Sequence, residues 1–157
     1  MKQLPQLNRL RIVILRVIVG SYWLYFSSQK WFNTSWVKPI LDESARTNPI
    51  PLVRNLISTL VISNWQAITA IQTILEATIG LLLLVGLLTR VAGILGALLA
   101  TTLLVCFSGL ADIALVFWFY LLSATASLTV AISDAGKTVG PDGLIAKKWP
   151  NSRIRLW

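Results

Sequence analysis

Four long apolar runs dominate the pattern of hydrophobic and polar positions along the chain. They cover Leu10–Ser28, Gln66–Leu88, Val91–Leu110 and Ile113–Ser133. At about 20 residues each, these runs are long enough to cross a hydrocarbon layer of ~30 Å as helices. Only short turns separate the last three runs. The pattern therefore predicts an all-α integral membrane protein, with a four-transmembrane-helix bundle formed by a single domain over residues 1–157.

The connection between the first two runs, residues 29–65, is longer and has a pattern of its own. Its second half carries apolar residues at i, i+1, i+4 spacing with polar residues opposite: Leu52, Val53, Leu56, Ile57, Leu60 and Val61. This spacing predicts an amphipathic helix of about ten residues that lies in the membrane interface or caps the bundle. Docking of an extracytoplasmic partner on this helix is the alternative.

Composition and charge support a membrane protein and set its orientation. The chain is 55% hydrophobic and only 13% charged, which is more apolar than soluble domains usually are. Of its 14 Lys and Arg residues, only Lys30, Lys38, Arg46 and Arg54 lie in the 29–65 connection. By the positive-inside rule, both termini, including the basic tail 134–157, are expected in the cytoplasm and the 29–65 insertion outside.

The net charge of +8 does not indicate a nucleic-acid partner, because no recognition motif accompanies it. The basic tail is better suited to anionic lipid headgroups. The sequence contains no histidine, and Met1 and Cys106 are its single methionine and cysteine. We therefore expect no metal site and no intrinsic haem, thiol or nucleotide cofactor. A redox function would depend on another subunit or on a mobile quinone.

Glu76 is the clearest candidate for a functional residue. It is the only acid deep inside an apolar run, and an ionisable group near the bilayer centre costs roughly 2.5 kcal/mol or more. Polar or small residues share its helix face at three- and four-residue spacing: Thr69, Gln72, Thr73 and Gly80. A polar stripe along one side of the second helix is therefore expected to face the bundle interior.

Arg16, inside the first run, is the predicted ion-pair partner of Glu76. Two alternatives remain open at this point. Arg16 could extend its side chain to the cytoplasmic headgroups, and Glu76 could be protonated and hydrogen-bonded to a threonine or tyrosine. Tyr120, in the middle of the fourth run, needs a hydrogen-bond partner and is a further candidate for this intramembrane polar site.

Three segments carry short motifs in order along the chain. Leu15–Arg16 and Gly20 open the first, which continues to Gln29–Phe32, and the second, 76–90, ends in a Gly-Leu-x-Thr-Arg turn. The third is the tail segment 134–146. The motif residues of the second and third segments are Gly80, Gly86, Thr89, Arg90, Asp134, Gly136, Lys137, Gly140 and Asp142. Together these segments resemble the DoxX/DoxD family of membrane proteins, although Lys137 stands where arginine is usual.

The resemblance implies a four-helix protein of the cytoplasmic membrane of a bacterium or archaeon. DoxD-type members are the small membrane subunit of thiosulfate:quinone oxidoreductase, and other DoxX-like proteins are membrane partners of soluble redox or stress-defence proteins. The expected function is thus an integral membrane subunit of a quinone-linked oxidoreductase, with quinone as a possible cofactor and another redox protein as partner. A non-catalytic scaffold that recruits partners is the alternative, and a small-solute transporter is a weaker one. Substrate, partner identity, a homo-oligomeric state and the ionisation of Glu76 are left open.

Overall fold

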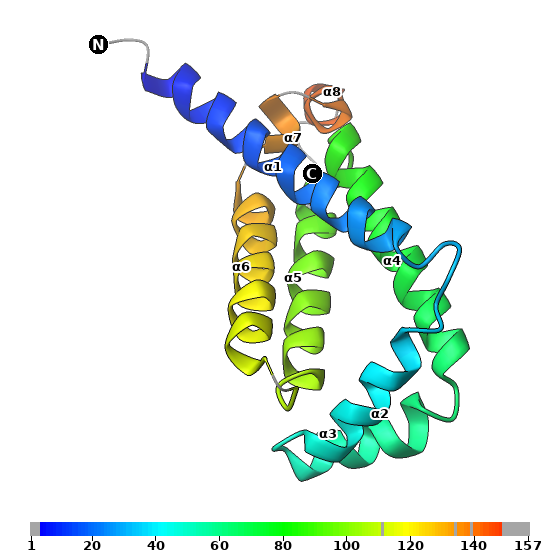
Figure 1. Cartoon of the computed structure of the whole chain (residues 1–157). Helices are drawn as coiled ribbons and strands as arrows, with labels where there is room; N and C mark the ends of the chain where they lie inside the picture. Colours follow the sequence, from blue (N-terminus) through cyan, green and yellow to red (C-terminus); the bar gives the residue numbers. More distant parts are fainter. Residues whose placement is uncertain (1–3, 111, 134, 139, 149–157) are drawn as a thin grey trace.

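The protein is a bundle of four long helices (Figure 1). The computed structural model describes residues 4–110, 112–133, 135–138 and 140–148. The long helices are α1 (Leu4–Ser28), α4 (Trp65–Val85), α5 (Thr89–Cys106) and α6 (Ile113–Ile132). Each contains a stretch that is long and apolar enough to cross a membrane, and no strand occurs among the described residues. The predicted four-helix membrane fold is confirmed.

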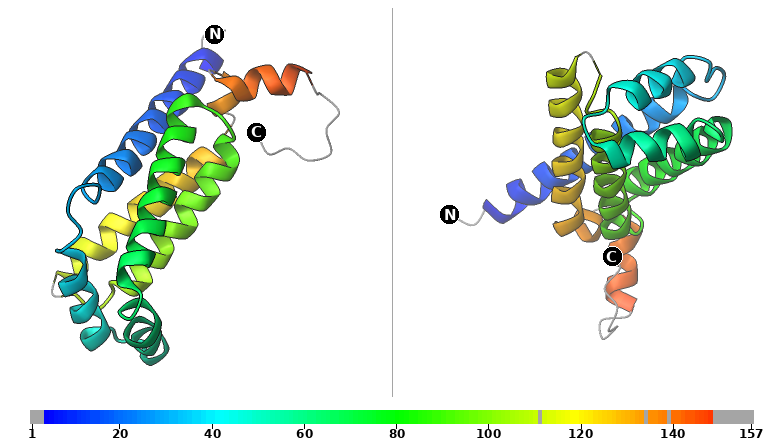
Figure 2. Two further views of the ribbon diagram at one scale, coloured as in Figure 1. Left: turned by 90° about the vertical axis from the view of Figure 1, so that its right-hand side faces the viewer. Right: turned by 90° about the horizontal axis from the view of Figure 1, so that it is seen from below.

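The four helices form two closely packed pairs. Helix α1 packs along α4, and α5 packs along α6, while the contact between α1 and α6 is much smaller. Figures 1 and 2 show that α1 crosses α6 at an angle instead of running along it. The faces of α1 and α6 therefore diverge on one side of the bundle.

Glycine allows the α1–α4 pair to pack closely. A Cβ atom at Gly80 would lie 2.9 Å from both the Gly20 carbonyl oxygen and the Leu24 nitrogen. The same device joins α5 to α6, where a Cβ atom at Gly93 would lie 2.7 Å from the Ser127 carbonyl oxygen. Close approach through small residues is how membrane helices gain van der Waals contact without a hydrophobic driving force.

Trp23 lies at the centre of the bundle. Only 1% of its surface is exposed, and its indole nitrogen donates a 3.2 Å hydrogen bond to the Ser127 hydroxyl of α6. The surrounding buried core consists of Val19, Ile79, Leu83, Ala92, Ala100 and Val130. On the outside, large apolar side chains such as Ile74, Leu98 and Leu122 are exposed, as expected of surfaces that contact lipid.

The turn between the second and third spanning helices comes earlier in the chain than the sequence predicted, at residues 86–88. Helix α4 ends at Val85 instead of Leu88, because Gly86 adopts a left-handed conformation with φ 80°. Its N–H donates to the Leu82 carbonyl, which closes the helix as a glycine C-cap. Leu88 is also left-handed, and α5 then begins at Thr89.

The 29–65 connection is largely helical. It forms α2 (Val37–Thr47), α3 (Pro51–Leu56) and a π-helical turn, η1 (Ile57–Val61). The helix expected over 52–61 is thus present as α3 and η1, whereas α2 was not expected. Asn48, which follows α2, donates hydrogen bonds of 3.0 and 2.8 Å to the carbonyls of Val105 and Cys106. The connection therefore binds the free carbonyl end of α5.

The tail forms two short helices against the opposite end of the bundle. These are α7 (Ala135–Thr138) and α8 (Pro141–Lys148). The backbone N–H of Asp142 lies 3.3 Å from the Gly86 carbonyl oxygen, so the tail contacts the α4–α5 turn. The distal tail, 149–157, and Asp134 lie outside the described residues.

Replacing Gly80 by valine should destabilise the protein, because the new side chain would meet the backbone of α1 at Gly20 and Leu24. We expect the free energy of unfolding to fall by about 1–3 kcal/mol, measured by detergent titration of the purified protein. Ala70→Val, on the exposed face of the same helix, is the matched control and should have little effect. Equal losses in both variants would rule out the α1–α4 contact as the cause.

Candidate functional site

Glu76 is paired with a residue that the sequence reasoning did not choose. Its Oε2 atom accepts a hydrogen bond from the Lys30 ammonium group, and its Oε1 atom accepts one of 2.8 Å from the Gln72 amide. The side chains of Lys30 and Glu76 are only 7% and 2% exposed. The predicted Arg16–Glu76 pair is wrong, whereas the predicted proximity of Gln72 to Glu76 is confirmed.

The turn that follows α1 places Lys30 next to α4. The N–H of Lys30 bonds to the Ser27 carbonyl, so the chain turns back immediately after the helix. The Ser27 hydroxyl donates to the Thr73 carbonyl (3.1 Å) and accepts from the Trp31 indole (3.0 Å). Thr73 precedes Glu76 by three residues and shares its helix face. The Lys30 side chain is thereby aligned with the carboxylate.

Sequence reasoning treated Lys30 only as a charge of the outer connection. Its side chain instead extends back into the bundle, where the ammonium group meets the Glu76 carboxylate. The sequence does contain a sign of this position, because Lys30 lies two residues beyond the end of the first apolar run. A lysine at that point can reach inward as well as toward the headgroups.

The Lys30–Glu76 pair is a site where a proton can move without a change in net charge. Transfer of one proton from the ammonium to the carboxylate converts the ion pair into a neutral amine and a neutral acid. Gln72 can hydrogen-bond to Glu76 in either state, because an amide both donates and accepts.

Two tyrosines lie in the same part of the bundle. Tyr22 of α1 is hydrogen-bonded to Ser123 of α6, with 2.7 Å between the two hydroxyl oxygens. Its ring packs against Phe26 and Phe119 at centroid distances of 4.8 and 5.6 Å. Tyr120 lies within electrostatic range of Glu76 and Tyr22, but no hydrogen bond joins it to Glu76. Neither tyrosine is hydrogen-bonded to Glu76, and the Tyr22 hydroxyl, which was not predicted, bonds to Ser123.

Arg16, midway along α1, belongs to a separate polar cluster formed with the tail. It is 3% exposed, and its Nη1 donates a 3.0 Å hydrogen bond to the Ala135 carbonyl of the tail. Asp142, which is fully buried, lies within electrostatic range of the guanidinium. Arg16 is therefore neither the partner of Glu76 nor extended to the headgroups. It holds the tail against the bundle.

Asp142 binds the free N–H groups at the start of α5. Its carboxylate accepts from the backbone N–H groups of Leu88 (2.7 Å) and Thr89 (2.9 Å) and from the Thr89 hydroxyl (2.7 Å). Free N–H groups and the helix dipole both favour a carboxylate at this point. Asp142, from a distant part of the chain, thus acts as the N-terminal cap of a membrane-spanning helix.

The other motif residues explain how the tail fits so closely. A Cβ atom at Gly136 would collide with the Asp142 carboxylate and the Thr89 hydroxyl, and one at Gly140 would lie 2.7 Å from the Gly86 carbonyl oxygen. These motif positions therefore form a structural joint between the tail and the α4–α5 turn. Gly80 belongs to the α1–α4 contact, Arg90 and Lys137 are exposed, and Asp134 lies outside the described residues.

A model of the DoxX family matches residues 11–109. The chain belongs to the DoxX family. The match covers α1 to the end of α5 and so includes Lys30, Gln72 and Glu76, whereas α6 and the tail lie beyond it.

Membership of the DoxX family agrees with the four apolar helices and indicates a multi-pass membrane protein. Neither the search of curated proteins nor the search of solved structures gave a match. Within the described ranges, no group of three or more histidine, cysteine or acidic residues could hold a metal ion. The buried Lys30–Glu76 pair, with Gln72, is the candidate site of this DoxX protein.

Breaking the buried pair should destabilise the protein, because the remaining charge would have no counter-charge. We expect Lys30→Met to lower the free energy of unfolding by about 3 kcal/mol or more. The double variant Lys30→Met/Glu76→Gln should recover part of this loss. Lys38→Met is the matched control, because Lys38 forms an exposed 3.0 Å pair with Asp42 that should contribute less than about 1 kcal/mol. Similar losses at Lys30 and Lys38 would contradict the buried pair.

Asp142→Ala should destabilise the tail joint by about 1–3 kcal/mol, because two backbone donors and a hydroxyl lose their acceptor. Hydrogen exchange at Leu88 and Thr89 should increase, and limited proteolysis of α7 and α8 should accelerate. Asp42→Ala removes an exposed carboxylate and serves as control. Unchanged exchange at the start of α5 would refute the capping role.

Proposed function

We propose that this DoxX protein is the membrane subunit of a quinone-linked oxidoreductase, in which Lys30 and Glu76 hold and transfer protons for quinone reduction. The observation that carries the proposal is the buried Lys30–Glu76–Gln72 cluster inside a membrane-spanning bundle. DoxX proteins are often associated with oxidoreductase and quinone systems. Segments 76–90 and 134–146 resemble the DoxX/DoxD family, whose DoxD-type members are subunits of thiosulfate:quinone oxidoreductase, and this favours thiosulfate as the electron donor.

The chemistry of the cluster fits this role. A quinone takes up protons together with electrons, and in the hydrocarbon layer those protons must come from a positioned side chain. The backbone of Lys30 lies just beyond the end of α1, while its ammonium group reaches the Glu76 carboxylate in the bundle. The two side chains therefore link the end of a spanning helix to its interior. Electrons would be delivered by a partner redox protein.

The fit to a quinone can be judged from the neighbouring residues. Aromatic rings of Tyr22, Phe26 and Phe119 provide apolar surface, and the Tyr22 hydroxyl provides a hydrogen-bond donor. Tyr22 also lies within electrostatic range of Glu76. Apolar walls with a few placed polar groups are typical of small-molecule sites, so the residues present suit an aromatic ring that carries a carbonyl.

A scaffold without catalytic activity is the second candidate. It is favoured by the fact that both Glu76 oxygens already have hydrogen-bond partners, which is what a purely structural pair requires. Exposed leucines on α3 and η1, Leu52 and Leu60, would then form part of a surface for recruiting partners. In this role the proton affinity of Lys30 would not matter.

Lys30→Arg separates the two functions. Arginine preserves the ion pair with Glu76 but does not release its proton at physiological pH. With the native partners present, thiosulfate-driven reduction of a quinone analogue should fall by about a hundredfold in Lys30→Arg and in Glu76→Gln. Lys38→Arg, on the exposed pair, should retain full turnover.

Thermal melting and co-purification of partners complete this experiment. If Lys30→Arg melts like the wild type and keeps its partners but loses turnover, a proton-transfer role is supported. Full turnover in both Lys30→Arg and Glu76→Gln would overturn it. The scaffold role predicts a different result, in which a Leu52→Ser/Leu60→Ser variant loses its partners while Glu76→Gln has no effect.

A further inference from the structure

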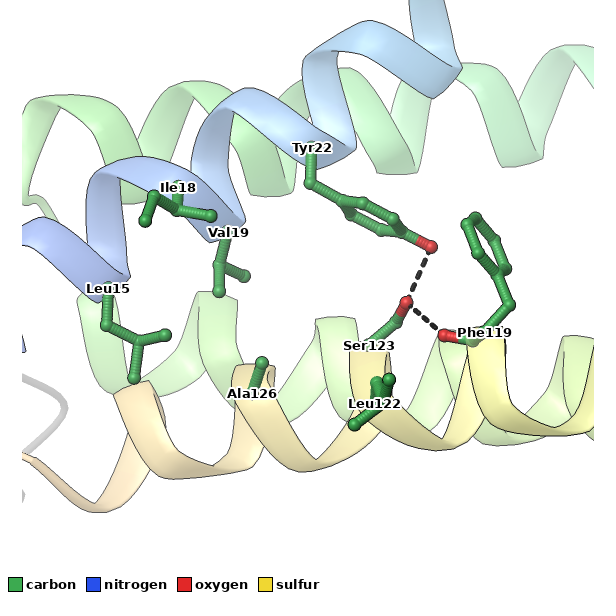
Figure 3. A pocket seen from close by; sticks show the side chains of 8 residues that line it. All are labelled: Leu15, Ile18, Val19, Tyr22, Phe119, Leu122, Ser123 and Ala126. Carbon is green, nitrogen blue, oxygen red and sulfur yellow. Dashed lines mark hydrogen bonds between the residues drawn. The ribbon is translucent and has the colours of Figure 1, made fainter.

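A groove of about 240 Å³ lies between α1 and α6, where the two helices diverge (Figure 3). Leu15, Ile18 and Tyr22 of α1 form one wall, and Leu122, Ser123 and Ala126 of α6 form the other. Figure 3 shows Leu15 and Ala126 at one end and the hydroxyls of Tyr22 and Ser123 at the other. The groove is therefore apolar along its length and polar at a single point.

The groove opens toward the lipid. Ile18 and Leu122, at its edges, are 59% and 63% exposed, and both belong to membrane-spanning stretches. An occupant would enter sideways from the hydrocarbon layer without crossing water. This access favours a molecule that is dissolved in the membrane.

The Tyr22 hydroxyl can exchange its bond to Ser123 for a bond to a ligand without leaving a buried donor unpaired. The Ser123 hydroxyl also lies 2.7 Å from the Phe119 carbonyl oxygen, one helical turn earlier. A serine hydroxyl has a single proton, so Ser123 donates to Phe119 and accepts from Tyr22. When the Tyr22 hydroxyl turns to another acceptor, Ser123 keeps its bond to the backbone and no buried donor is left unpaired.

We propose that this groove is the lateral binding site for the ring of a membrane-dissolved quinone, with Tyr22 donating a hydrogen bond to a ring carbonyl. The proposal deepens, and rests on, the quinone-linked function proposed above. The volume suits a single ring with part of its substituents, being slightly below the ~300 Å³ at which pockets for larger ligands begin. The isoprenoid chain would leave between Ile18 and Leu122 into the lipid.

The position of Tyr22 favours a quinone over the acyl chain of a phospholipid. Tyr22 is the thirteenth of the 19 residues of the spanning stretch Leu10–Ser28. At 1.5 Å per residue it lies about 9 Å inside the nearer end, a depth at which a phospholipid offers only methylene groups. Its ester carbonyls remain at the interface, so an acyl chain would leave the Tyr22 donor without a new acceptor. A quinone carries its carbonyls on the mobile ring and can bring one to this depth.

The test uses the full chain in lipid nanodiscs and a short-chain ubiquinone analogue as the probe. The wild type should bind the analogue saturably. Tyr22→Phe should weaken binding by about tenfold, the effect of one hydrogen bond. Tyr25→Phe is the matched control, because Tyr25 is 59% exposed on the same helix and should leave affinity unchanged.

A second pair of variants tests the volume of the groove without altering its polar groups. Ala126→Leu should fill the groove and abolish saturable binding, whereas Leu128→Phe, on the exposed face of α6, should not. None of the four substitutions alters Trp23 or Ser127, whose hydrogen bond joins α1 to α6. Thermal melting then verifies that each variant is folded.

The site in the groove is overturned if Tyr22→Phe and Ala126→Leu bind the analogue as the wild type does. It is also overturned if the wild type binds no analogue and mass spectrometry finds only co-purified phospholipid. Failure of the groove is distinguishable from failure of the proton-transfer role. If only the groove site is wrong, Lys30→Arg still shows impaired turnover. If only the proton-transfer role is wrong, Tyr22→Phe still weakens quinone binding, while Lys30→Arg turns over normally.

Discussion

A charge inside a hydrocarbon layer needs a counter-charge or several hydrogen bonds, because no water is present to solvate it. This requirement organises both ends of the bundle. Near the end of α1, Lys30 meets Glu76 of α4. Midway along α1, Arg16 lies with Asp142 and the Ala135 carbonyl of the tail. Each cluster joins segments that are far apart in the sequence, so the ionic requirement also determines which parts of the chain must come together.

The packing between these clusters explains where space remains for a ligand. Glycines bring α1 to α4 and α5 to α6 at backbone distance. Trp23, by contrast, is the largest fully buried side chain, and it stands where α1 meets the other pair. Two tight pairs joined around a bulky indole leave a wedge between α1 and α6. The hydroxyls of Tyr22 and Ser123 lie in this wedge, on the side that lipid can reach.

The main features of the fold follow from the sequence, and the pairing of charges does not. Apolar length identifies the spanning helices, and three- and four-residue spacing correctly places Gln72 beside Glu76. Spacing gives the depth of a residue along its own helix, but not the direction in which that helix faces its neighbours. Arg16 and Glu76 were therefore matched by depth, although Arg16 faces the tail. Lys30 was not predicted as the partner of Glu76, because a basic residue just beyond a membrane-spanning helix usually indicates only the orientation of that helix in the membrane.

The cap that Asp142 provides to α5 has a consequence for how the chain is made. Helix α5 is synthesised well before residue 142, so it enters the membrane with the N–H groups of Leu88 and Thr89 still lacking this acceptor. The hydrogen bond from Arg16 to the Ala135 carbonyl likewise cannot form until the tail has been synthesised. Both contacts of the joint can form only after residues 135–142 have been synthesised. The joint therefore closes late, after all four spanning helices have been made, and a chain that stops before residue 142 would lack the cap of α5.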